Sequence, residues 1–131
     1  MRLHEAIRLG AMNTEQGFGP LSITSDTAPC ALGAARHAAG IFTTHLYVYN
    51  ALMARWPVLG TYVVFPIKDG GWRPTLVEAI YTLNDTFRWS REQIADWVEG
   101  VELEWERSQA QAQTQAQAQP APMEESTAVT A

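Results

Sequence analysis

The 131-residue sequence has little of what marks several common classes of protein. A single cysteine excludes an intramolecular disulfide, so nothing indicates an oxidising compartment. Nine basic residues face fourteen acidic ones, and the formal net charge of −5 argues against a general electrostatic attraction to nucleic acid or anionic lipid. Residues 1–12 lack the continuous apolar run of a signal peptide. The cytoplasm is therefore the expected location.

Long uninterrupted apolar runs are scarce as well. The segment 46–67 carries one charge, Arg55, and reaches the length of about 20 residues that a bilayer crossing needs. Arg55 falls in the middle of the segment, and Pro57 and Gly60 interrupt it. We therefore expect no membrane span and no membrane partner.

Apolar residues at helical spacing indicate a mainly α protein. Two capping boxes give the sharpest signals: Thr75 with Glu78, and Ser90 with Gln93. The predicted helix 27–39 has a face of small residues that a neighbouring element can approach closely: Cys30, Gly33, Ala34 and Ala38. The predicted helices cover 2–12, 27–39, 45–56, 75–84 and 90–105.

One extended element is also expected. The run TYVVFPI, residues 61–67, is rich in β-branched and aromatic residues, and Asp69, Gly70 and Gly71 follow it with turn chemistry. The predicted fold is thus mainly α, a single small bundle of four or five helices with one short strand or β-hairpin near 61–72. Residues 1–107 form the single helical domain, and 108–131 are predicted to be a disordered Gln/Ala/Pro-rich tail.

The residues that could carry chemistry are few. Cys30 and His37 are seven positions apart on one predicted helix, a rise of about 10 Å, too far to bind one metal ion or to act as a nucleophile and its base. His4 and His45 stay open as partners of Cys30. We assign no catalytic, cofactor-binding or metal-ligating residue, and expect a protein that is not an enzyme and needs no cofactor.

Asn84 and Asp85 lie between two predicted helices. Their side chains are expected to end the first helix and fix the turn through hydrogen bonds to the backbone. The alternative is a polar contact site at the turn, beside Arg88 and Arg91.

Three segments carry a resemblance: EAIRLGAM at 5–12, CALGAA at 30–35, and LNDTFRWSREQIADWVEGVE at 83–102. They resemble segments of small, uncharacterised bacterial and phage-derived proteins. The resemblance implies a compact bacterial or phage accessory protein and brings no activity, ligand or site residue. Residues 41–74 match no pattern of that group.

The last predicted helix concentrates negative charge. Residues 91–107 hold two arginines and six carboxylates, a net charge of −4. We therefore expect a protein-interaction module that docks a basic patch of a partner protein. The predicted contact residues are Glu99, Glu102, Glu106 and Trp105.

A second interpretation is a helix-turn-helix-like nucleic-acid-binding protein, with 90–100 as the first helix of the motif and a turn at Gly100. The segment that would then read DNA, 101–108, carries three glutamates and one arginine. Carboxylates repel phosphates, which argues against nucleic acid as the partner.

Overall fold

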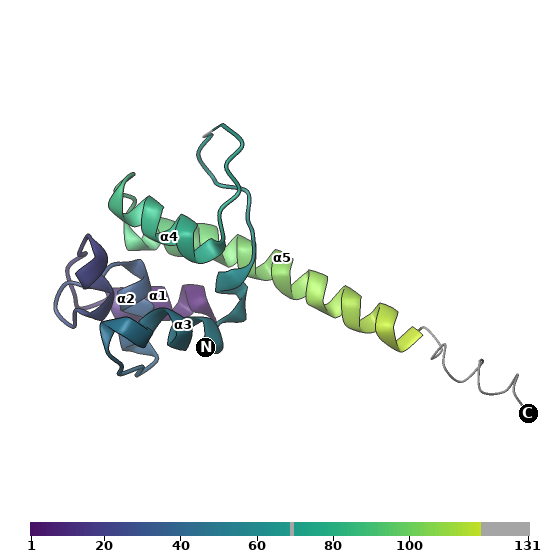
Figure 1. Ribbon diagram of the computed structural model, residues 1–131, viewed down its shortest axis with the longest axis horizontal. Helices are drawn as coiled ribbons and strands as arrows, with labels where there is room; N and C mark the ends of the chain where they lie inside the picture. Colours follow the sequence, from purple (N-terminus) through teal and green to yellow (C-terminus); the bar gives the residue numbers. More distant parts are fainter. Residues whose placement is uncertain (69, 119–131) are drawn as a thin grey trace, which may run out of the picture.

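The computed structural model describes residues 1–68 and 70–118. Its α-helices are α1 (Leu3–Ala11), α2 (Ala31–Ala38), α3 (Val48–Arg55), α4 (Leu76–Asp85) and α5 (Arg91–Ala118), joined in part by short 3₁₀ turns. Figure 1 shows α1, α2 and α3 on one side of the body, α4 on the other, and α5 running under α4 and out beyond the body. The mainly helical fold is therefore confirmed.

Both predicted capping boxes form. Thr75 Oγ1 accepts from the Glu78 N–H at 3.4 Å, and Glu78 accepts from the Thr75 N–H at 3.0 Å. Ser90 and Gln93 exchange the corresponding bonds at 3.1 and 2.9 Å. These local bonds satisfy N–H groups that the first turn of a helix leaves without partners, so the starts of α4 and α5 could be read from four residues each.

Helix α2 begins later than predicted, at Ala31 rather than near Thr27. Cys30 is its N-cap, with Sγ accepting from the Gly33 N–H at 3.4 Å. Asp26, just before the predicted start of this helix, instead binds the buried Arg36 at 2.6 Å. The carboxylate therefore serves a tertiary contact rather than the helix start.

The core centres on the packing of α1 against α2 and α5. The two helices α1 and α2 meet at Gly10, where an added Cβ would lie 1.9 Å from the Ala34 carbonyl oxygen. The predicted close approach to the small face of α2 is thus confirmed at Ala34. No side chain larger than hydrogen fits at Gly10 without separating the helices.

The predicted strand or β-hairpin near 61–72 is wrong. Within 1–68 and 70–118 the structure has no strand, only an isolated antiparallel bridge between Tyr62 and Thr75. The Val63 N–H donates to the Pro74 carbonyl at 2.9 Å, but Pro74 has no N–H with which to return the bond. Residues 61–68 and 70–75 instead belong to a loop that projects from the body above α4 and α5 in Figure 1.

Helix α5 is longer than predicted and passes through Gly100 without a break. Helix therefore occupies 108–118, where the sequence predicts a disordered tail, and the rest of that tail, 119–131, lies outside the described residues. Because α5 does not turn at Gly100, the helix-turn-helix interpretation loses its turn. None of the described helices combines the length and apolar character that crossing a bilayer requires.

Candidate functional site

One face of α5 holds α1 in place through carboxylates. Glu102 is buried, and its two oxygens accept the backbone N–H groups of Leu3 and His4 at 2.9 and 2.8 Å. His4 Nδ1 donates to the same carboxylate at 2.7 Å. An anion at a helix N-terminus satisfies donors that have no partner within the helix and interacts favourably with the helix dipole. Glu102 is thus the anchor of α1.

The neighbouring carboxylates extend this contact along α1. Arg8 Nη2 lies 3.2 Å from Glu99, and Arg8 also binds Glu92 and Asp96. These carboxylates, Asp96 first, hold the pKa of the Arg8 guanidinium above its usual value. At the other end of α1, Arg2 Nε lies 3.1 Å from Glu106.

The acidic residues expected to face a partner are therefore paired with α1, although the Glu92 and Asp96 side chains remain 67% and 65% exposed. The expectation that Glu102 faces solvent is wrong, because this residue is 5% exposed and bonded to α1. Glu99 and Glu106 remain partly exposed but have arginine partners within the chain. Positions 92, 96, 99, 102 and 106 recur at helical spacing, which places them along the face that meets α1.

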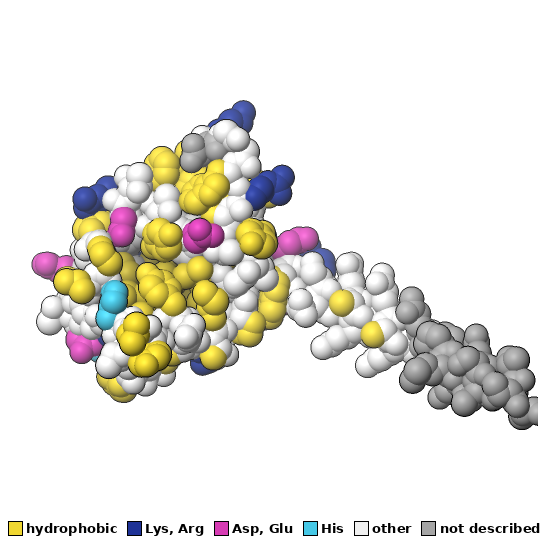
Figure 2. All heavy atoms as spheres, in the orientation of Figure 1, with side chains coloured by type: hydrophobic (Ala, Val, Ile, Leu, Met, Phe, Trp, Pro, Cys, Tyr) yellow, Lys and Arg dark blue, Asp and Glu magenta, His cyan; other side chains and the backbone are white. Residues whose placement is uncertain are grey.

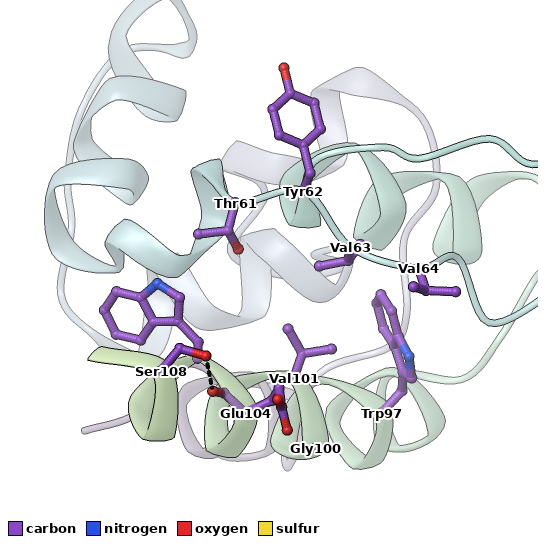
Figure 3. A pocket seen from close by; sticks show the side chains of 10 residues that line it. Thr61, Tyr62, Val63, Val64, Trp97, Gly100, Val101, Glu104 and Ser108 are labelled. Carbon is purple, nitrogen blue, oxygen red and sulfur yellow. Dashed lines mark hydrogen bonds between the residues drawn. The ribbon is translucent and has the colours of Figure 1, made fainter. Parts of the chain in front are cut away.

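The other face of α5 lines an open depression, which we call the α5 groove. Figure 3 shows its two walls, the extended segment 61–64 and residues 97–108 of α5, with Trp97 rising from α5 toward Val64 and the Tyr62 ring pointing away from α5. Its cavity volume is about 520 Å³. The lining residues are Thr61, Tyr62, Val63, Val64, Trp97, Gly100, Val101, Glu104, Trp105 and Ser108.

Gly100 helps to keep this groove open. A Cβ built on Gly100 meets no atom within 4 Å, so the absence of a side chain there leaves empty space rather than a packed contact. Trp105, the fourth predicted contact residue, is half-buried and belongs to this groove. The structure therefore separates Trp105 from Glu102, which lies in the contact with α1.

Cys30, His4 and His37 each have a different hydrogen-bond partner. Cys30 is buried, and burial raises the pKa of its thiol. His4 binds Glu102, and His37 Nδ1 lies 3.3 Å from Asp26. Across the residues that the structure describes, no group of three or more His, Cys, Asp or Glu side chains could hold a metal ion.

Asn84 and Asp85, at the end of α4, make different contacts. Asn84 is fully buried and accepts from the Ala31 N–H at 3.1 Å and from Gln16 at 2.9 Å, while donating to the Gly17 carbonyl at 2.9 Å. It ties α4 to the start of α2 and to the loop before it, a longer-range role than the predicted local turn. Asp85 accepts from the Gly19 N–H at 3.1 Å and lines a second cavity together with Cys30.

Comparison with protein-family models, curated proteins and solved structures found no significant match.

Trp105 is the one predicted contact residue among those that line the α5 groove. A signal was available on α5, since positions 97, 101, 105 and 108 fall on one helical stripe. The facing wall, 61–64, could not be placed because its position depends on the Tyr62–Thr75 bridge and on the Leu76 N–H bond to the Thr61 carbonyl at 2.8 Å.

Proposed function

We propose that this protein is a non-enzymatic protein-interaction module whose α5 groove binds an apolar segment of a partner protein, with a basic residue of that segment beside Glu104. The observation that carries the proposal is the groove lined by Trp97, Val101 and Trp105, which nothing in the described chain fills. Aromatic residues around a depression are typical of sites where a partner's apolar side chains are removed from water. The resemblance to small bacterial and phage-derived proteins is consistent with an accessory role of this kind.

The charge of the groove favours a basic partner. Glu104 is the one charged residue among the ten that line it. Its carboxylate lies 3.1 Å from Arg107, and both side chains are about 70% exposed. An exposed pair of this kind contributes about 0–1 kcal/mol, so a lysine or arginine of the partner can replace Arg107 at little cost.

The acidic stripe is the weaker candidate for docking. Releasing Glu102 to a partner would leave the Leu3 and His4 N–H groups buried without an acceptor. The proposed partner contact is therefore the α5 groove and not Glu99, Glu102 and Glu106. Trp105, which lines the groove, is the one residue predicted from the sequence that belongs to this contact.

A blocking variant tests the proposal without disturbing the core. In Gly100→Leu, the new side chain enters the open groove, where an added Cβ meets no neighbouring atom. The matched control is Gln109→Leu, which adds the same side chain to an exposed position of α5 that does not line the groove. Circular dichroism and thermal melting verify that both variants fold.

The probe is a phage-displayed library of random peptides, selected on the immobilised full chain. Enriched peptides are synthesised, and their dissociation constants are measured by fluorescence polarisation. We expect peptides with clustered apolar residues and a lysine or arginine, with affinity reduced at least about tenfold by Gly100→Leu, reduced less by Glu104→Gln, and unchanged by Gln109→Leu. Failure to enrich any peptide, or peptides that bind Gly100→Leu as tightly as the wild type, would refute the proposal. Binding of a mixed-sequence DNA duplex that Gly100→Leu leaves unchanged would favour the nucleic-acid interpretation.

A further inference from the structure

A second cavity is lined by residues from other elements than those that line the α5 groove. Its volume is about 490 Å³, within the range of about 300–1,000 Å³ that small-molecule sites occupy. The 3₁₀ turn 20–24 with Gly19, the start of α2, one turn of α3 and the end of α4 each contribute to it. The lining residues are Gly19, Pro20, Ile23, Cys30, Leu32, Tyr49, Tyr81 and Asp85.

Asp85 presents a fixed carboxylate to this cavity. Its Oδ1 accepts from the Gly19 N–H at 3.1 Å and from Asn84 Nδ2 at 2.8 Å, so two protein donors orient the group. Oδ2 has no hydrogen-bond partner in the described part of the chain. Since no buried side-chain oxygen of that part lacks a partner, Oδ2 is open to the cavity or to solvent.

No positive charge in the cavity neutralises this carboxylate. Asp85 is the one charged residue among the eight that line the cavity, and across 1–68 and 70–118 it has no basic partner within 4.0 Å. Nearby Arg88 is placed over the Phe18 ring, 3.9 Å from its centroid. Burial raises the pKa values of Cys30 and Tyr49, so both groups are neutral at pH 7 and contribute no charge of their own.

The remaining walls suit the rest of a small organic cation. Tyr49 and Tyr81 supply aromatic rings, whose faces attract ammonium groups. Pro20, Ile23 and Leu32 supply apolar surface for a hydrocarbon portion. A carboxylate beside aromatic rings and an apolar wall is complementary to an amine that carries an apolar group.

From this arrangement we infer that the cavity is a binding site for a small primary ammonium ion with an aromatic or alkyl substituent, with Asp85 Oδ2 accepting from the ammonium group and the two tyrosine rings flanking it. The site is separate from the α5 groove, since the two cavities share no lining residue.

Three probes of similar size and different charge test the inference at pH 7: 2-phenylethylammonium, the neutral 2-phenylethanol and the anion 3-phenylpropionate. Their binding to the full chain is measured by titration calorimetry and by ¹⁵N–¹H chemical-shift mapping. We expect the ammonium to bind at least about tenfold more tightly than either other probe, because it alone can pair with Asp85. Its shift changes should lie at the start of α2 and the end of α4.

Asp85→Asn is the decisive variant, because the amide oxygen can keep the bond from the Gly19 N–H while the charge is lost. We expect it to weaken the ammonium at least about tenfold and to leave 2-phenylethanol unchanged. If Asp85→Asn fails to fold, Tyr81→Ala, at a residue 40% exposed, removes one ring and should weaken the ammonium severalfold. Glu104→Gln, in the α5 groove, is the matched control and should have no effect.

The inference is overturned if the ammonium does not bind the wild type, if 2-phenylethanol binds equally well, or if neither Asp85→Asn nor Tyr81→Ala weakens the ammonium. Shift changes confined to Trp97, Val101 and Trp105 would also overturn it, because they would place the ligand in the α5 groove. Peptide binding in that groove is measured independently, so either proposal can fail alone.

Discussion

Replacing Glu102 by glutamine should destabilise the whole protein although it removes only one charge. The carboxylate accepts three hydrogen bonds, from the Leu3 and His4 N–H groups and from His4 Nδ1, at 2.7 to 2.9 Å. Glutamine offers one acceptor oxygen and turns an NH₂ group toward donors that need an acceptor. Buried residues surround the site, so water cannot substitute freely.

The magnitude follows from these bonds. A hydrogen bond to a charged group contributes about 1.5–3 kcal/mol, and a buried donor left unsatisfied costs about 1–3 kcal/mol. Because one glutamine oxygen can retain part of the network, we expect Glu102→Gln to lower the free energy of unfolding by about 2–3 kcal/mol, which corresponds to a fall in Tm of roughly 8–12 °C. The matched change Glu106→Gln removes a partly exposed pair with Arg2 and should cost no more than about 1 kcal/mol.

Urea unfolding followed by far-ultraviolet circular dichroism measures both variants against the wild type. A Glu102→Gln variant within about 0.5 kcal/mol of Glu106→Gln would refute the reasoning, since the two residues would then contribute equally despite their difference in burial. It would also restore Glu102 as a candidate for docking.

Three further predictions concern stability. Gly10→Ala should lower the free energy of unfolding by more than about 2 kcal/mol, because its Cβ would overlap the Ala34 carbonyl, whereas Gly100→Ala should raise it by about 0.5–1 kcal/mol; equal effects in urea unfolding would contradict the packing described. Asn84→Ala should cost about 2–4 kcal/mol and speed amide exchange at Ala31, whose N–H loses its acceptor. The bonds from Thr75 lower the pKa of the Glu78 carboxyl, so its contribution to stability is present above the unfolded-state pKa and lost as pH falls through the folded-state value. Glu78→Gln should therefore flatten the acid side of the pH dependence of Tm, and an unchanged profile would contradict this.

The predictions that succeeded rest on short-range chemistry. The capping boxes at Thr75 and Ser90 involve residues three apart, so the sequence itself contains both partners of each bond. The predicted strand at 61–67 failed because β-propensity describes a residue's fit to a sheet, and a sheet requires a partner strand. The segment that pairs with 61–63 contains Pro74, which cannot donate to the ladder.

The candidate site was harder to predict because its determinants are distant in sequence. Glu102 meets Leu3 and His4 across 99 and 98 residues, and these contacts distinguish it from the solvent-facing Glu104. The burial of Arg36 and Arg91 also depends on distant residues, because each donates to a backbone carbonyl elsewhere in the chain. Charge counting treats all these residues as surface and therefore assigns a role in partner binding to groups that hold the fold together.

The 28 residues of α5 give a rod about 42 Å long, of which the last turns extend past everything else described in Figure 1. A globule with a rod attached experiences more friction in water than a sphere of equal mass. The chain should therefore sediment slowly and elute early from a gel-filtration column for its 14.5 kDa. Its hydrodynamic radius should fall when α5 is shortened at Arg107, with no change in the number of subunits.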